Sequence, residues 1–191
     1  MKLSIACVGT RKLTNRALRW MEAMGAEIAR GGYRIVTGNA PGSDQAWARG
    51  GNSVDPNAVL LVIPWKGFER KVIQKGNDIL SFSDDVLGPD FYDALAKAES
   101  LHPRWEACSA GARLLHGRNV IIARKSSLMV GYPGSTGGTK LAFAASIDLG
   151  RPVYDIRDEV QRAKFEKAVS EHRLEDLLVL GKGFEPSLTG S

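Results

Sequence analysis

The sequence feature that most constrains the fold is a strand-like run that occurs three times in the first third of the chain. Residues 3–8, 33–37 and 58–63 are rich in apolar and β-branched side chains. Between the first two runs, apolar residues recur at helical spacing, which predicts a helix. A second helix is predicted to start near Ser43-Asp44. The run at 58–63 is continuously apolar, as in a parallel strand buried on both faces. This βαβαβ order predicts the first half of a doubly wound fold.

The second half of the chain continues the alternation after a less regular segment, residues 66–104, which we interpret as an insertion. Helices are predicted at 105–115, 140–149 and 158–171, strands at 128–132 and 153–156, and a short strand at 177–180. We therefore expect an α/β, Rossmann-like doubly wound fold whose mainly parallel sheet has helices on both faces. Its 191 residues suit a single domain, with a core over about 3–156 and a C-terminal helical extension over about 157–191.

Composition and local motifs argue against several classes of protein. With 43% apolar and 25% charged residues, neither disorder nor a membrane-embedded chain is expected. The N-terminal residues lack the apolar core and cleavage site of a signal peptide, which predicts a cytoplasmic protein. Two cysteines and three histidines, without a CxxC or HExxH motif, do not make a four-ligand zinc site of the usual Cys/His type. We therefore predict no metal site.

Three loops share a composition that suits phosphate binding, and each follows a predicted strand. Because the carboxyl ends of parallel strands meet at one edge of the sheet, these loops are expected to lie together where ligands bind in open α/β sheets. Glycines let the backbone approach an anion, helix N-termini supply free N–H groups, and hydroxyls add donors. The candidate residues are Gly9, Thr10, Arg11, Gly38, Asn39, Ala40, Gly42, Ser43, Asp44, Pro133, Gly134, Ser135, Thr136, Gly137, Gly138 and Thr139.

Each of these loops also has a purely structural interpretation. Gly9, Gly38 and Gly42 suit tight turns between a strand and a helix, and Asp44 suits a helix N-cap. The loop at 133–139 favours binding more strongly, because a plain turn does not need three glycines and three hydroxyls together. The loop is neither a P-loop of the form GxxxxGKS or GxxxxGKT, nor is there a GxGxxG motif after the first strand.

Basic residues are concentrated in the parts of the chain that carry these loops. Residues 1–50 hold eight basic and three acidic side chains, and residues 101–150 hold six and two, within a total net charge of +5. Arg118 suits a bidentate phosphate contact and Asn119 suits orienting a base or a loop, although both also suit a solvated helix end. If the two basic blocks meet, Lys12 and Lys140 are further candidate contacts to DNA phosphates, with Arg11 and Arg118.

The order of these motifs resembles the Rossmann-like SLOG superfamily, which includes the core of the DNA-processing protein A (DprA/Smf) family, YspA-like proteins and cytokinin-activating phosphoribohydrolases. The resemblance rests on Val8-Gly9-Thr10-Arg11, on residues 37–44, on Arg118-Asn119 and on residues 135–139. Short phage-type DprA-like proteins look similar also in His102-Pro103 with a following Trp105. The resemblance implies single-stranded DNA or a nucleotide as the partner, self-association into a homo-oligomer, and the cytoplasm of a bacterial or phage-infected cell.

The resemblance also bears on catalysis. The phosphoribohydrolases carry a PGGxGTxxE motif whose Glu serves glycosidic-bond cleavage, and the corresponding position here is Ala142. No catalytic residue is predicted, so binding of single-stranded DNA or a nucleotide is favoured over an enzymatic function. Two alternatives stay open: an N-glycosidase that acts on nucleoside phosphates, and a sensor or sequestering protein for a small nucleotide signal in defence or counter-defence. Apart from a bound nucleotide, no cofactor is assigned.

Overall fold

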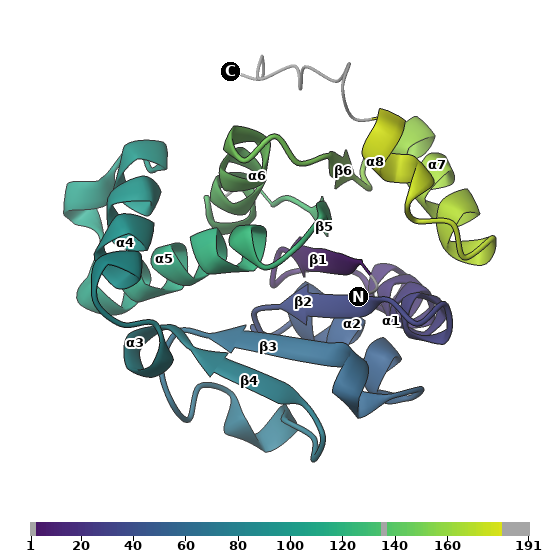
Figure 1. Ribbon diagram of the computed structural model, residues 1–191, viewed down its shortest axis with the longest axis horizontal. Helices are drawn as coiled ribbons and strands as arrows, with labels where there is room; N and C mark the ends of the chain where they lie inside the picture. Colours follow the sequence, from purple (N-terminus) through teal and green to yellow (C-terminus); the bar gives the residue numbers. More distant parts are fainter. Residues whose placement is uncertain (1–2, 135–136, 181–191) are drawn as a thin grey trace.

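A six-stranded, all-parallel sheet forms the centre of the molecule, in the strand order β4-β3-β2-β1-β5-β6 (Figure 1). The computed structural model describes residues 3–134 and 137–180. The strands are β1 (Ser4–Gly9), β2 (Arg34–Thr37), β3 (Val59–Ile63), β4 (Asp78–Ser81), β5 (Leu128–Tyr132) and β6 (Val153–Asp155). This architecture confirms the α/β, Rossmann-like fold class.

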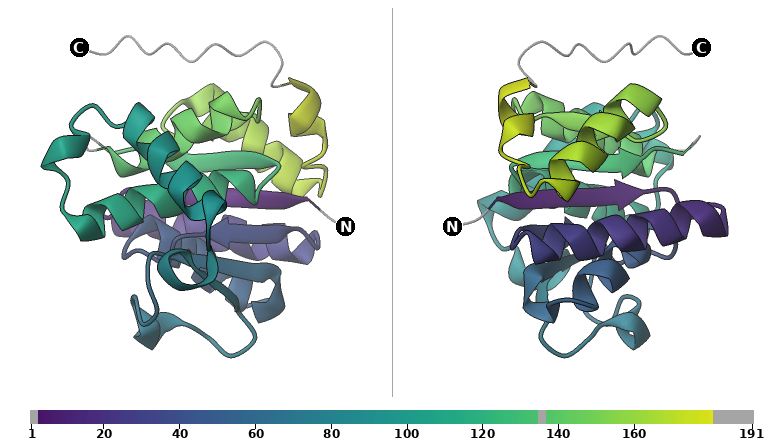
Figure 2. Two further views of the ribbon diagram at one scale, coloured as in Figure 1. Left: turned by 60° about the vertical axis from the view of Figure 1, so that its left-hand side comes forward. Right: turned by 90° about the vertical axis from the view of Figure 1, so that its right-hand side faces the viewer.

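Helices cover both faces of the sheet, and the two views in Figure 2 bring opposite faces forward. The helices are α1 (Asn15–Arg30), α2 (Ser43–Asn52), α3 (Phe82–Asp85), α4 (Pro89–Leu101), α5 (Ala110–Arg124), α6 (Gly138–Asp148), α7 (Glu159–Ser170) and α8 (Asp176–Leu180). The short 3-10 helices are η1 (Pro56–Ala58), η2 (Arg70–Val72) and η3 (Trp105–Ala107). Side chains of β1 alternate between the two faces: Ile5 and Cys7 pack with α1, α2 and α7, whereas Ala6 and Val8 pack with α4, α5 and α6.

The topology places a switch point beside β1. From β1 the chain builds the sheet outward through β2 and β3 to β4, then returns to add β5 and β6 on the other side of β1. β1 and β5 therefore lie side by side while their connections leave in opposite directions. In open α/β sheets, the crevice outside the carboxyl ends of such a strand pair is where ligands bind.

Three local predictions were wrong. Residues 78–81, inside the segment interpreted as an insertion, form the edge strand β4, which the apolar pattern does not reveal because Ile79 is 48% exposed. The helix expected at 105–115 instead starts at Ala110 and continues to Arg124, so that the glycine at position 117 is a packing site within it. Residues 177–180 belong to helix α8 and not to a strand.

The C-terminal helices pack on the face of the sheet that α1 covers. Phe165 of α7 is fully buried beside Trp47, and the Trp20 indole N–H donates a 2.6 Å hydrogen bond to Glu166. The Tyr33 hydroxyl lies 2.6 Å from the His172 carbonyl oxygen and 2.7 Å from a carboxylate oxygen of Glu175. The division of the chain at residue 157 stays a prediction. Within the described ranges, none of the helices has the length and apolarity to cross a membrane.

Candidate functional site

Two of the three glycine-containing loops flank the switch point between β1 and β5. Gly9, the last residue of β1, is in register with Tyr132, the last residue of β5. Immediately beyond, the Thr10 N–H donates a 2.9 Å hydrogen bond to the Tyr132 carbonyl oxygen. This bond joins the β1–α1 loop to the β5–α6 loop across more than 120 residues of sequence. The two loops therefore form one continuous edge.

The glycines lie where these loops touch one another. A Cβ atom at Gly134 would lie 2.7 Å from Thr10 Oγ1, and one at Gly9 would lie 2.3 Å from Ser43 Oγ. At Gly42, where φ is +91°, a Cβ atom would lie 2.6 Å from the Arg11 carbonyl oxygen. Any side chain at these positions would separate the loops. These glycines thus allow the loops to pack closely at the edge, a role different from the tight strand-to-helix turns weighed from the sequence.

Ser43 is bound to the neighbouring loop. Its hydroxyl donates a 2.8 Å hydrogen bond to the Thr10 carbonyl oxygen, and its backbone N–H approaches the same oxygen at 3.3 Å. The start of α2 is therefore fastened to the β1–α1 loop. The Ser43 hydroxyl proton is already committed to this bond, so the residue positions the loop.

Asp44 and Arg118 form a buried ion pair beneath the loops. Each is only 4% exposed, and Arg118 Nη1 lies 3.4 Å from Asp44 Oδ2. The same carboxylate oxygen accepts a 3.3 Å hydrogen bond from the Ala40 N–H. The predicted N-cap role was wrong, because Gly42 is the N-cap residue of α2 and Asp44 lies in its first turn. The pair instead ties the centre of α5 to the first turn of α2.

Gly38 makes room for this pair, since a Cβ atom there would lie 1.1 Å from Arg118 Nη1. Burial raises the pKa of Asp44. The positive charge of Arg118, and the backbone N–H groups that donate to the Asp44 carboxylate, oppose this rise. Burial likewise lowers the pKa of Arg118 from its usual value. Within the described part of the chain, Arg118 Nε has no hydrogen-bond partner. Arg118 is therefore not a solvated helix end, and its contact with phosphate stays a prediction.

Asn119 fixes the beginning of α6, because its side-chain amide donates a 3.0 Å hydrogen bond to the Gly138 carbonyl oxygen. Asn39 is 1% exposed and adopts a φ of +60°, and its amide lies 3.3 Å from the Glu69 carbonyl oxygen. Ala40, Pro133 and Thr139 are also buried. Asn119 thus orients the start of α6, and its predicted contact with a phosphate or nucleotide stays a prediction.

Among the residues of this edge that the structure describes, three charged side chains remain exposed. Arg11, Lys12 and Lys140 are exposed, and Lys140 lies in the first turn of α6. Gly137 is the N-cap residue of α6, and among the described residues no side chain caps this helix. A helix N-terminus is a favourable place for an anion. Ser135 and Thr136, two of the predicted hydroxyl donors, lie outside the described residues.

Residues that the sequence analysis did not select also lie beside the edge. A Cβ atom at Gly137 would lie 3.6 Å from His102 Nε2, and the His102 ring packs against that of His116 with centroids 4.5 Å apart. Burial, with the charges of His102 and Arg118, lowers the pKa of His116 to about 4, so its ring is neutral at pH 7. The signal in the sequence is the spacing of His102, Cys108 and His116, which becomes informative only once α5 is known to extend past residue 115.

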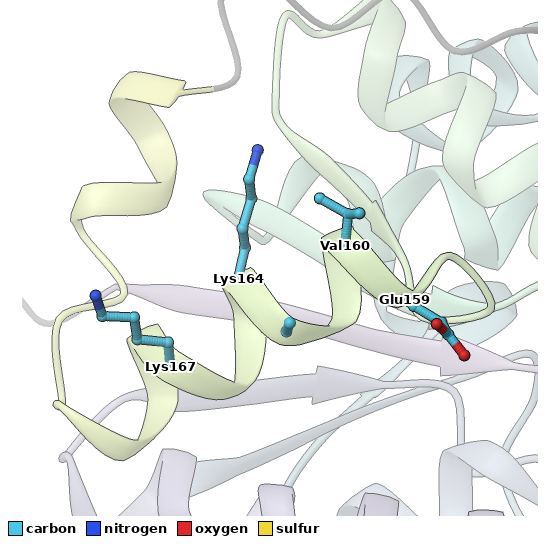
Figure 3. Close-up of a pocket in the computed structure, with 5 residues that line it drawn as sticks. Glu159, Val160, Lys164 and Lys167 are labelled. Atoms are coloured by element: carbon cyan, nitrogen blue, oxygen red, sulfur yellow. The ribbon is translucent and has the colours of Figure 1, made fainter.

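A separate depression of about 440 Å³ lies along α7 (Figure 3). It is open, and it is lined by Glu159, Val160, Ala163, Lys164 and Lys167. These residues all come from one helix, and they include none of the loop residues described above. The depression is therefore not part of the candidate site.

Comparison with known proteins shows where this fold also occurs. Residues 1–61, from the start of the chain through most of β3, match the family model of DNA recombination-mediator protein A. The structure of DNA processing protein A from Helicobacter pylori, reported for its unique single-stranded DNA binding mode, superposes with a TM-score of 0.60 at 17% identity. The match covers 92% of this chain and 81% of that protein. The core of this chain therefore shares the fold of DNA processing protein A.

Two further solved structures share the fold of this DprA-like core. DNA processing protein A (DprA) from Streptococcus pneumoniae has a TM-score of 0.56 at 21% identity; the match covers 81% of this chain but only 50% of that longer protein. The molybdenum cofactor binding protein from Rippkaea orientalis has a TM-score of 0.55 at 16% identity, covering 94% of this chain and 98% of that protein. No curated protein sequence matches the chain.

Proposed function

We propose that this DprA-like chain binds single-stranded DNA through its phosphates at the carboxyl-end edge of the sheet. The observation that carries the proposal is the joining of the β1–α1 and β5–α6 loops at the switch point, with the N-terminus of α6 beside them. Backbone N–H groups at a helix N-terminus bind phosphate well, because the helix dipole adds a partial positive charge to the unpaired donors.

The charge of the exposed side chains at this edge supports a polyanion as the ligand. Arg11 and Lys12 follow Thr10, whose side chain lies against Gly134 of the β5–α6 loop. Lys140 comes from the first turn of α6. Three exposed cations, two on the β1–α1 loop and one on α6, match successive phosphates better than one phosphate group. Arg118 acts beneath them as a positioning residue, since its charge is paired with Asp44.

Single-stranded DNA is favoured over a free nucleotide for two reasons. DNA processing protein A from Helicobacter pylori, which shares the fold over 92% of this chain, is reported for its single-stranded DNA binding mode. The family model of DNA recombination-mediator protein A also matches the segment that contains the β1–α1 and β2–α2 loops. The names of this protein and of this family both refer to DNA, and neither refers to a free nucleotide.

Fluorescence anisotropy with a labelled single-stranded oligonucleotide tests this proposal. Each phosphate contact contributes about −0.7 to the slope of log affinity against log salt for single strands. Three contacts, from Arg11, Lys12 and Lys140, therefore predict a slope near −2. The affinity should then fall about twentyfold between about 50 and 200 mM salt. No binding at the lower salt concentration would overturn the proposal.

Matched single substitutions locate the interface. Lys12→Ala should weaken binding and reduce the magnitude of the salt slope by about 0.7, because one phosphate contact is lost. Lys125→Ala is the control, since Lys125 is also exposed but precedes β5 and therefore lies at the opposite edge of the sheet. Equal effects of the two substitutions would contradict this location of the interface.

A thermal-shift series with mononucleotides and cyclic nucleotides distinguishes the alternative ligands, because a ligand that binds only the folded chain raises its apparent stability. If a mononucleotide stabilises the chain while the oligonucleotide does not bind, the ligand is a nucleotide and the DNA proposal fails. Release of free base from a nucleoside monophosphate would instead identify an N-glycosidase. The homo-oligomer implied by the family resemblance stays a prediction.

A further inference from the structure

Three potential metal ligands come together outside the loops described above. They are His102, which follows α4, Cys108, which follows η3, and His116, which lies within α5. One ligand atom from each lies within 4.8 Å of the other two. The Cys108 sulfur lies 3.8 Å from Nδ1 and 3.9 Å from Nε2 of His102. All three side chains are partly buried.

These separations are close to those that a tetrahedral zinc ion requires. Zinc–sulfur bonds of about 2.3 Å and zinc–nitrogen bonds of about 2.0–2.1 Å place neighbouring ligand atoms about 3.3–3.6 Å apart. The Cys108–His102 separation therefore needs to shorten by only a few tenths of an ångström. The separations between His116 and the other two ligands can close by rotation of the side chains, because the three residues already lie on adjoining segments of the chain.

The hydrogen bonding of the two histidines leaves them able to act as ligands. Within the described residues, Nδ1 of His116 is buried and has no hydrogen-bond partner. Nδ1 of His102 accepts a 3.2 Å hydrogen bond from the Arg104 N–H. Metal binding would replace this bond, and because Arg104 is exposed its N–H can turn to water. The Trp105 ring, 6.3 Å from both imidazole centroids, packs beside them.

We propose that His102, Cys108 and His116 bind a divalent transition metal ion of the zinc type. Neutral imidazoles and a cysteine thiolate are ligands that zinc prefers, and binding releases the Cys108 thiol proton to solvent. Three protein ligands leave one tetrahedral position for water or for an oxygen of a bound molecule, as in zinc sites that are open to substrate.

The charge of the assembled site indicates what the fourth ligand would be. A doubly charged ion with one thiolate and two neutral imidazoles has a net charge of +1. An anionic oxygen is therefore favoured at the open position. The β5–α6 loop lies beside the cluster, since a Cβ atom at Gly137 would lie 3.6 Å from His102 Nε2. A phosphate oxygen held at this loop has the charge that the site requires.

The sequence analysis predicted no metal because it counted ligands for a closed, four-ligand site. An open site needs three protein ligands, and two histidines with one cysteine suffice. Residues 102 and 108 lie in irregular chain whose course the sequence does not define, so their approach to residue 116 becomes visible only in the folded structure.

Cobalt and zinc titrations of the full chain, stripped with a chelator and kept reduced, test the proposal. Cobalt should bind one ion per chain and produce a thiolate-to-metal charge-transfer band together with the visible bands of tetrahedral cobalt, which zinc then removes. Zinc should also raise the melting temperature of the chain by mass action. Absence of saturable binding at one ion per chain, or cobalt binding without the thiolate band, would overturn the proposal.

Substitutions assign the ligands. Cys108→Ser should abolish the charge-transfer band, and His116→Gln should weaken zinc binding at least tenfold. His172→Asn is the matched control: it removes the third histidine, and Asn tolerates the positive φ of +52° at that position. Circular dichroism verifies that each variant folds. If one ligand variant does not fold, the cobalt spectrum of the wild type and the other variant still show whether these residues bind the metal. Zinc binding lost equally in His172→Asn would place the metal elsewhere and overturn the assignment.

This test is independent of the proposed function. The metal titrations contain no DNA, so a thiolate–cobalt band in a chain that does not bind DNA would support the metal site and contradict only the DNA proposal. Conversely, DNA binding by a chain that takes up no metal would support the proposed function and overturn the metal site.

Discussion

Individual residues at the carboxyl-end edge divide into those that hold the loops and those that remain accessible. Ser43, Asp44, Arg118 and Asn119 each bond to another loop or helix, whereas Arg11 and Lys12 are exposed. Sequence composition does not separate the two groups, because a serine or arginine that fastens a loop has the same side chain as one that binds phosphate. The distinction depends on partners up to 74 residues away, which only the fold supplies.

The Asp44–Arg118 pair gives the first prediction. Asp44→Asn should reduce the free energy of unfolding by about 3–5 kcal/mol, because it leaves the buried Arg118 charge without its counter-charge. Arg118→Met should have a comparable cost. The double variant should lose less than the sum of the two, since both charges leave the interior together. Urea denaturation of the wild type, the two single variants and the double variant measures their free energies of unfolding. Strictly additive losses would show that the two side chains do not interact.

Secondary-structure elements were predicted well where the apolar pattern is regular. β1, β2, β3, β5 and β6 lie within one or two residues of their predicted bounds. Edge strand β4 was missed because one side of it faces solvent. The extent of α5 was missed because its glycines weaken the helical signal, and tertiary packing overrides that local preference.

The glycines of α5 give a second prediction, with an internal control. Gly111→Ala should stabilise the chain by about 0.5–1 kcal/mol, since alanine favours helix and the new Cβ atom meets only Trp65, at 3.9 Å. Gly117→Ala should destabilise it by about 1–3 kcal/mol, because the new Cβ atom would lie 2.5 Å from the buried Phe82 ring. Thermal unfolding of both variants compares them, and equal shifts of the same sign would contradict this packing.

The anchoring of the C-terminal helices gives a third prediction. Tyr33→Phe should lower stability by about 0.5–1.5 kcal/mol, because its hydroxyl bonds to the His172–Glu175 turn are lost. Burial and the neighbouring Glu175 carboxylate raise the pKa of Tyr33. The folded chain therefore retains this proton more tightly than the unfolded chain. Stability from Tyr33 is fully present below about pH 10 and is lost as the pH rises above it.

Chemical denaturation of the wild type and of Tyr33→Phe between neutral pH and about pH 11 tests whether the stability from Tyr33 falls as the pH rises. The difference in stability between the two proteins should shrink as the pH rises. A difference that stays constant or grows would show that the Tyr33 hydroxyl is not what couples this turn to the pH.

The whole molecule shows which part of the site was predictable. The βαβαβ order and the later strands were sufficient to place three loops at one edge of a parallel sheet, because parallel strands share the direction of their carboxyl ends. The order did not reveal that β5 pairs with β1, or that the chain carries a His/Cys/His cluster beside the edge. These depend on contacts between segments that are distant in sequence, and no local pattern encodes them.

Hydrogen exchange gives a prediction at the scale of the whole molecule. Addition of single-stranded DNA should slow exchange at 9–12 and 137–141 together, since both segments lie at the carboxyl-end edge. The turns at 31–33 and 149–152, at the opposite edge, should not change. Mass spectrometry of peptic fragments resolves these segments, and protection confined to the opposite edge would contradict the proposed interface.

The hydrogen bond from Thr10 to Tyr132 has a consequence for how the chain folds. During synthesis, the β1–α1 loop emerges early, but the strand that completes the edge follows more than a hundred residues later. Closing a loop of this length is entropically costly, and contacts of such sequence separation slow folding. A nascent chain released after β3 would therefore carry residues 1–63 and still lack β5. Binding competence should accordingly be acquired late, when β5 joins β1.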